Sequence, residues 1–234
     1  SQFPLMILRI YRENWDGILM NRWLAHPAAK PVVWTLLALP FAWLLWCAVQ
    51  NTLGANPAEA LIRSLGDWTL RSLCLTLAIS PLRQWTGWHQ LLRHRRAIGV
   101  ATFAYGTLHW LAYAWLDQGL EIDALLKDVA KRPFILVGTL AWLLLLPLAA
   151  TSFNRAIKWL GGKRWQALHR AVYLIAGLGI LHFFWMRSAK SNYAEVIVYA
   201  AIIAVLLGWR AWGGWKRRQR AVEPSIKLSV HRAR

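Results

Sequence analysis

The feature that most constrains this sequence is a series of six long apolar stretches separated by charged segments. The stretches cover residues 32–50, 65–82, 97–116, 134–153, 168–186 and 194–212. At about 1.5 Å per residue, a helix of each length crosses close to 30 Å of hydrocarbon. Backbone groups in lipid must be satisfied within the segment, so each stretch is expected to be helical. The sequence therefore predicts an all-α integral membrane protein, built as a bundle of six transmembrane helices.

The charges lie between these stretches. The formal net charge is +18, yet the chain is 57% hydrophobic. Basic residues gather in segments 83–96 and 155–164 and after residue 215, whereas the alternate connections are acidic or short. The positive-inside rule then places both termini in the cytoplasm. We interpret the basic charge as topology and contact with anionic lipid, and we expect no nucleic-acid partner.

Three regions follow from this pattern. Residues 1–31 form an amphipathic N-terminal extension, cytoplasmic or interfacial, whose segments 3–8 and 18–24 suit the membrane surface. Residues 32–212 form the six-helix transmembrane domain, and residues 213–234 form a basic cytoplasmic tail. No phosphate-binding loop, dinucleotide fingerprint or metalloprotease helix occurs in the sequence.

Two histidines lie deep inside separate apolar stretches. His109 is about 18 Å and His182 about 21 Å from the cytoplasmic side, if each stretch is a regular helix. An unpaired imidazole in hydrocarbon is costly, so each ring needs a partner. One interpretation is a haem iron held between the two helices, and the other is an ordinary interhelical hydrogen bond. Aromatic residues suited to line such a haem, or to pack ordinarily, are Phe103, Tyr105, Trp110, Tyr113, Tyr173, Phe183 and Phe184.

A second site is predicted at the cytoplasmic edge around His169. His94 has a similar height and is a candidate partner, although its arginine-rich setting favours a solvated loop. On a straight helix, His169 and His182 lie roughly 140° apart around the axis. Arg71 lies inside the second stretch, where it either pairs with a haem propionate or extends to the outer interface.

Three strings carry a family resemblance. They are R-R-A-I-G-V-A-T-F-A-Y-G-T-L-H, K-R-P-F-I-L-V-G-T-L-A-W and G-K-R-W-Q-A-L-H-R-A-V-Y-L-I-A-G-L-G-I-L-H-F-F-W. They closely resemble the MsrQ (YedZ) family, the haem-binding membrane subunits of bacterial periplasmic methionine sulfoxide reductase systems, within the ferric-reductase-like transmembrane group. The resemblance runs from about residue 32 to residue 218, so the preceding residues are expected to extend beyond the family's usual start.

The resemblance implies one or two b-type haems carried by His109, His169 and His182. It implies a multi-pass protein of the bacterial inner membrane that passes electrons to a separate catalytic partner. That partner is a periplasmic molybdopterin methionine sulfoxide reductase, which repairs oxidised periplasmic proteins. The implied electron donor is the quinone pool or a cytosolic flavin reductase, and flavin mononucleotide (FMN) is associated with the family.

The basic cytoplasmic segments supply candidate anion ligands. Arg95, Arg96 and Arg164 suit haem propionates or a flavin phosphate, although topology alone also explains them. Larger relatives hold two stacked haems with two histidines on each of two helices, whereas the third stretch here contains one. Two alternatives to the main hypothesis are a ferric- or oxygen-reducing transmembrane cytochrome, and a cofactor-free transporter or assembly subunit.

Overall fold

The computed structural model describes residues 17–188 and 192–232, and every regular element in these ranges is helical. The six long helices are α2 (Ala29–Val49), α3 (Pro57–Thr86), α4 (Arg95–Ala112), α6 (Pro133–Ala150), α9 (Ala171–Ser188) and α10 (Ala194–Arg232). The shorter elements are the 3-10 helix η1 (His89–Arg93), the π-helical turn η2 (Tyr113–Asp117), α5 (Ile122–Lys131), α7 (Asn154–Leu160) and α8 (Gly162–His169). Residues 17–25 are also helical. Each of the six apolar stretches thus contains a long helix.

Four segments are long and apolar enough to cross a membrane by length and composition. They are Ala29–Val49, Pro133–Ala150, Gly162–Ser188 and Ala194–Lys216. α3 has sufficient length but carries Arg63, Asp67 and Arg71, and α4 begins with two arginines. α3 also has many buried positions, including Leu65, which shows that it packs in the interior of the bundle. The described residues therefore form a helical bundle with four candidate membrane spans, in which α3 and α4 contact each other.

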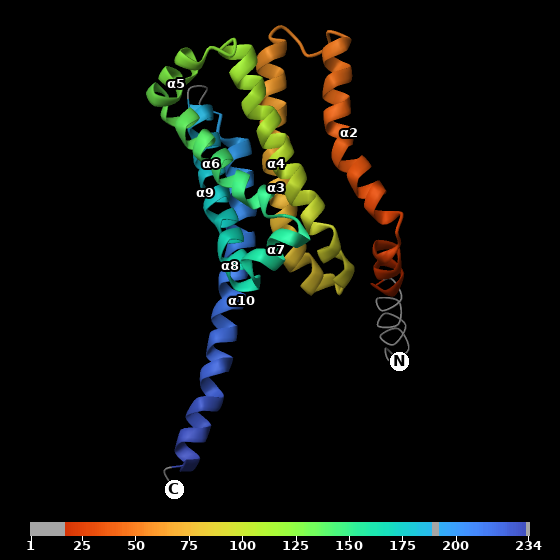
Figure 1. Cartoon of the computed structure of the whole chain (residues 1–234), viewed down its shortest axis with the longest axis vertical. Coiled ribbons are helices and arrows are strands. Elements are labelled where there is room, and N and C mark those ends of the chain that lie inside the picture. The colour runs from red at the N-terminus through yellow and green to blue at the C-terminus, as the bar shows by residue number, and fades with distance from the viewer. Residues whose placement is uncertain (1–16, 189–191, 233–234) are drawn as a thin grey trace, which may run out of the picture.

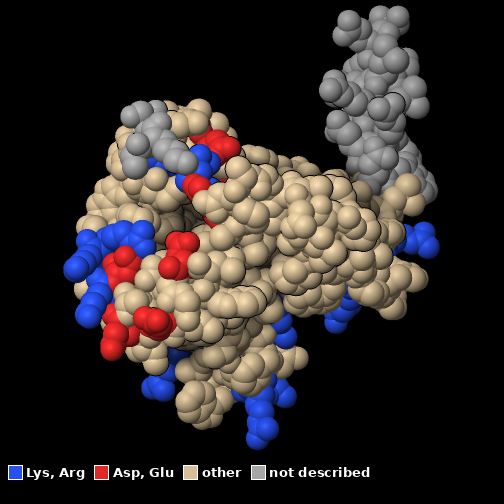
Figure 2. Space-filling model, turned by 90° about the horizontal axis from the view of Figure 1, so that it is seen from above, with Lys and Arg blue, Asp and Glu red and all other residues tan. Residues whose placement is uncertain are grey.

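The helices run side by side, and the short elements lie at the two ends (Figure 1). α5 lies at one end, which we call the α5 end, whereas η1, α7 and α8 lie at the other. The helix over residues 17–25 and the last part of α10 also lie toward the η1 end. Acidic side chains gather at the α5 end, which Figure 2 shows from above. Lys and Arg side chains lie beside the acidic ones on this face.

The main core lies where α3, α6, α9 and α10 meet. Leu77 and Ala176 are fully buried there and Ile175 is nearly so. α2 stands at the edge of the bundle, and Ala29 and Leu44 are its buried residues. Its attachment includes a hydrogen bond of 2.7 Å from the Tyr105 hydroxyl to the Leu37 carbonyl.

Local sequence signals explain where α3 begins and ends. The Asn56 side chain accepts a hydrogen bond of 3.2 Å from the Glu59 backbone N–H, and Pro57 occupies the first turn. These are standard features of a helix N-terminus. At the other end Gly87 has a φ of 70°, a left-handed conformation that glycine adopts without steric cost.

The helix boundaries add detail to the regions expected from the sequence. The fifth stretch is not one straight helix, because α8 ends at His169 and a turn at Arg170 precedes α9. The last apolar stretch lies within α10, which continues through residue 232 into the part expected to form the basic tail. The expected interfacial segment 3–8 lies outside the described residues.

Candidate functional site

The two deep histidines face each other across the bundle. His109 on α4 and His182 on α9 have ring centroids 6.1 Å apart, with ring planes at 76°. The two histidines are separated by more than seventy residues of sequence. The matched depth predicted from the sequence is confirmed at this contact.

Each of the two imidazole rings also contacts a backbone carbonyl of a neighbouring helix. Nδ1 of His109 lies 2.8 Å from the Ile62 carbonyl oxygen on α3, and Nδ1 of His182 lies 2.6 Å from the Phe134 carbonyl oxygen on α6. A carbonyl oxygen only accepts, so each Nδ1 donates its proton and each Nε2 of the neutral ring keeps its lone pair. A metal-binding histidine usually donates its second N–H in this way.

The separation of the two rings suits one metal between them. A ring nitrogen binds a metal at about 2.0–2.1 Å, so two imidazoles on opposite sides of it have centroids roughly 6 Å apart. The observed 6.1 Å agrees with this value. Among the described residues, no group of three or more His, Cys, Asp or Glu side chains is placed to hold a metal ion. Two histidines alone favour a metal whose remaining ligands come from a cofactor, as in a haem.

Two glycines let the imidazoles approach neighbouring helices. A Cβ on Gly66 would lie 3.1 Å from Cε1 of His109, and a Cβ on Gly138 would lie 2.7 Å from Nδ1 of His182. Distances below 3.0 Å are essentially never observed for a real Cβ, so any larger residue at position 138 would force His182 or its surroundings to shift. The small residues therefore determine where both rings lie.

A cavity of about 490 Å³ adjoins the two histidines, between α3, α4, α6 and α9. One wall contains Trp110 and Trp142, which stack with centroids 4.7 Å apart and planes at 9°. Tyr113 and Phe183 also line the cavity. Its volume lies within the usual range for cofactor sites, which are mostly apolar with a few placed polar groups. The residues present therefore fit a bound haem.

The expected aromatic residues fall into two groups. Trp110, Tyr113 and Phe183 line the cavity. Others have different roles: Tyr173 accepts a hydrogen bond from Arg210, and Phe184 stacks on Tyr193.

His169 lies at the η1 end, away from this pair. Its Nε2 is 3.0 Å from the Thr151 hydroxyl, and its ring stacks on Trp165 at 4.0 Å. The turn at Arg170 breaks the straight helix from which the angle between His169 and His182 was estimated.

His94 is not in a solvated loop as its basic setting indicated. It is only 4% exposed, and its Nε2 lies 3.1 Å from the Leu24 carbonyl oxygen. The ring thus attaches the helix over residues 17–25 to the start of α4. The hydrogen bonds of His94 and His169 go to different partners, so a shared iron between them remains a prediction.

The predicted arginines occupy several places. Arg71 donates from Nε to the Tyr199 hydroxyl at 3.0 Å and lines a separate groove between α2 and α3, so it does not line the histidine cavity. Arg95 is half-buried at the start of α4, and its charge acts on His169. Arg96 donates to Asn154 at 2.7 Å, and Arg164 is exposed on α8.

Several residues of the site are not predicted by the sequence. Gly66, Gly138 and Trp142 lie in apolar stretches, where the sequence does not show which residue faces the histidines. Arg63 and Arg132 line the cavity toward the α5 end, and they were assigned to connecting segments. Their spacing of four residues from Glu59 and Asp128 was the available signal, because such pairs form ion pairs on helices.

Comparison with known proteins determines the family. Residues 65–180 match the model for the ferric reductase like transmembrane component. A relative from Polaromonas naphthalenivorans is 56% identical over 211 residues, which cover 90% of this chain and 96% of the relative. That protein is named protein-methionine-sulfoxide reductase heme-binding subunit MsrQ. The chain belongs to the MsrQ family.

Further MsrQ relatives carry the same name. The Ralstonia nicotianae protein is 50% identical over 83% of this chain and 90% of its own length. The Caulobacter vibrioides protein is 43% identical over 78% of this chain and 86% of its own length. No solved structure matches the chain. The ferric-reductase match contains His109 and His169 and ends two residues before His182.

Proposed function

We propose that this protein is the haem-binding electron-transfer subunit of a methionine sulfoxide reductase system. In this proposal it passes electrons across the bacterial inner membrane to a periplasmic molybdopterin reductase, which carries out the catalysis. The observation that carries the proposal is the facing pair His109 and His182, each with Nδ1 directed at a backbone carbonyl. The relatives' names support the haem-binding role.

When bound, a b-type haem supplies reversible one-electron oxidation and reduction at its iron. His109 and His182 would hold the iron through their Nε2 atoms, and the carbonyl groups of Ile62 and Phe134 fix the orientation of the rings. The stacked Trp110 and Trp142 exclude water from one side of the cavity. An apolar surrounding of this kind favours neutral imidazoles.

We assign six spans to residues 32–212, which adds α3 and α4 to the four helices that are apolar enough alone. The clustering of basic segments at the η1 end supports a cytoplasmic position for both termini. Electrons from the quinone pool or a flavin reductase would then enter near His169, with Arg95, Arg96 and Arg164 available to hold propionates of a second haem or an FMN phosphate.

The test is a reduced-minus-oxidised absorption spectrum of the purified protein, with haem and flavin quantified per chain. We expect a low-spin b-type spectrum that His109→Ala and His182→Ala each abolish or convert to a high-spin form. His89→Ala is the matched control, because His89 is exposed in η1. Unchanged haem content and spectrum in both cavity variants would overturn the proposed site.

The same preparation separates the alternative functions. A colourless protein would support a cofactor-free transporter or assembly subunit. If haem is present, the reduced protein is mixed separately with the periplasmic reductase, a ferric chelate and oxygen. Fastest oxidation by ferric chelate or oxygen would favour the alternative cytochrome and contradict the proposed acceptor.

A further inference from the structure

Two arginines lie at the α5 end of the histidine cavity, on opposite walls. Arg63 is on α3, one helical turn from Gly66, which touches His109. Arg132 precedes α6, about two turns from Gly138, which touches His182. Both α3 and α6 begin at the α5 end (Figure 1), so along each helix the arginine comes before the glycine that touches a histidine.

One N–H group of Arg132 has no hydrogen-bond partner among the described residues. Its terminal nitrogen binds Asp128, but within the described residues its buried Nε has no hydrogen-bond partner. An unpaired buried donor is costly, and an arginine donates through five N–H groups. The guanidinium also lies 5.6 Å from the Phe134 ring, whose centroid is 6.1 Å from that of His182. Arg132, Phe134 and His182 therefore line the same cavity, with Phe134 next to both the guanidinium and the imidazole.

Asp128 holds this arginine in place. It accepts from Arg132, from the Tyr113 hydroxyl at 2.5 Å and from the Gln118 amide at 3.3 Å. Although burial alone would raise the pKa of Asp128, the hydrogen bonds from Arg132 and Tyr113 hold that pKa below its usual range. The carboxylate therefore stays charged and fixes the guanidinium at the cavity mouth.

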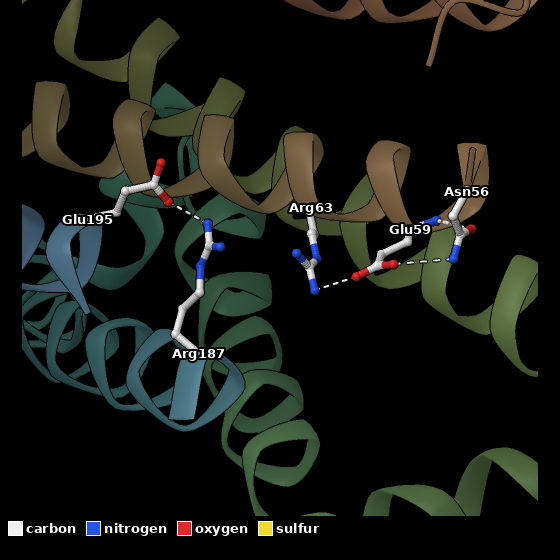
Figure 3. Close-up of polar contacts among 5 residues, drawn as sticks. All are labelled: Asn56, Glu59, Arg63, Arg187 and Glu195. Carbon is white, nitrogen blue, oxygen red and sulfur yellow. Dashed lines mark hydrogen bonds and ion pairs between the residues drawn. The ribbon is translucent and has the colours of Figure 1, made fainter. Parts of the chain in front are cut away.

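Arg63 is oriented in a similar way on the other wall. It pairs with Glu59, which in turn accepts from the Asn56 amide, as Figure 3 shows. The neighbouring Arg187 bridges from α9 to Glu195 on α10, and its buried Nε likewise has no hydrogen-bond partner among the described residues. Arg63 and Arg132 line the cavity together with Glu59, Asp67 and Asp117. A further carboxylate entering this mouth would need both cations to offset these acidic neighbours.

We propose that Arg63 and Arg132 bind the two carboxylates of the haem at the α5 end of the His109–His182 cavity. The assignment rests on the proposed function, since it requires haem in this cavity. A haem carries both carboxylates on one edge, which suits two cations on one side of the axial pair. Guanidinium groups match carboxylates as a two-pronged fork. The assignment replaces Arg71, which the sequence suggested and which contacts Tyr199 instead.

The test measures how fast the purified protein releases haem to excess apomyoglobin. The two cavity variants are Arg63→Gln and Arg132→Gln. One control is Arg71→Gln, which removes a positive charge from α3 outside the cavity, and the other is Lys131→Gln, which removes the charge of the exposed residue next to Arg132. We expect each cavity variant to keep a low-spin spectrum and to release haem about tenfold faster or more, because a charge-assisted hydrogen bond is lost. The two controls should release haem at the wild-type rate.

A second measurement changes the haem in the wild-type protein, so its main comparison does not depend on how the variants fold. Reconstitution with haem dimethyl ester removes both carboxylates, and we expect faster release than for haem itself. Arg132→Gln should add little to that effect if the arginine acts through the carboxylate. The midpoint potential should also fall in Arg132→Gln, because removing a positive charge near the iron favours the oxidised form.

The outcomes separate this inference from the proposed function. Wild-type release of haem and its dimethyl ester at equal rates would overturn the carboxylate assignment, as would cavity variants that behave like Arg71→Gln. In both cases a spectrum that still depends on His109 and His182 would leave the haem site intact. A wild-type protein without haem would overturn both.

Discussion

The close approach of Gly138 to His182 gives a sharp test of the site. Gly138→Ala adds a Cβ that would lie 2.7 Å from Nδ1 and 2.8 Å from Cε1 of the ring. Ordinary contacts begin near 3.4 Å, so the ring must move by about 0.7 Å. The ring is constrained on its other side by the hydrogen bond of 2.6 Å to the Phe134 carbonyl. Moving it therefore strains that bond or the helix backbone.

The expected cost follows from these contacts. Overpacking costs about 1–3 kcal/mol, and a lost hydrogen bond costs about 1 kcal/mol more. Replacing glycine by alanine in a helix stabilises the helix by about 1 kcal/mol. The net destabilisation is therefore about 1–3 kcal/mol. A functional group must also stay within about 0.5 Å of its working position, so the shift of His182 exceeds the tolerance.

The assay is haem content per chain, the optical spectrum and the thermal midpoint of the purified variant. Gly138→Ala should lose haem or show a high-spin fraction. Gly66→Ala should have a weaker effect, because its Cβ would be 3.1 Å from the His109 ring and a smaller shift suffices. Gly177→Ala is the control, because a Cβ there meets nothing within 4 Å. If Gly138→Ala matched wild type in haem content and spectrum, the inferred placement of His182 would be wrong.

Three further predictions concern contacts around the site. Tyr105→Phe removes the hydrogen bond to the Leu37 carbonyl and should lower the free energy of unfolding by about 1 kcal/mol. Hydrogen exchange in α2 should become faster, and an unchanged exchange rate there would contradict this. His94→Ala should expose the helix that contains Leu24 to limited proteolysis while haem content stays constant; loss of haem would instead assign His94 to a cofactor. The pKa of Asp128 is lower in the folded protein than in the unfolded chain, so its contribution to stability is present above about pH 4 and is lost as the pH falls further. Asp128→Asn should flatten the fall in thermal midpoint between about pH 5 and about pH 3, and an equally steep fall would contradict this assignment.

Sequence reasoning located the histidine pair but not its surroundings. Depth along a helix follows from counting residues, and it placed His109 and His182 at matching heights before any packing was known. Rotation about the helix axis is not determined by that count. Arg71 illustrates this, because its depth suited a haem carboxylate while its side chain contacts Tyr199. His94 illustrates the same point, because its charged neighbours did not reveal that its ring is buried.

The sequence by itself determined the helical fold class, the approximate extent of each long helix and the separation of basic from acidic segments. These properties depend on hydrophobic run length, charge position and the need to satisfy backbone groups, all of which are local. Only the tertiary structure decided which side chains meet. Three contacts depend on how separate helices rotate and pack. They are the approach of Gly66 and Gly138 to the two rings, the stacking of Trp142 on Trp110, and the position of Arg132 at the cavity. Those contacts join residues distant in the chain, and their energies depend on shape complementarity that no single segment contains.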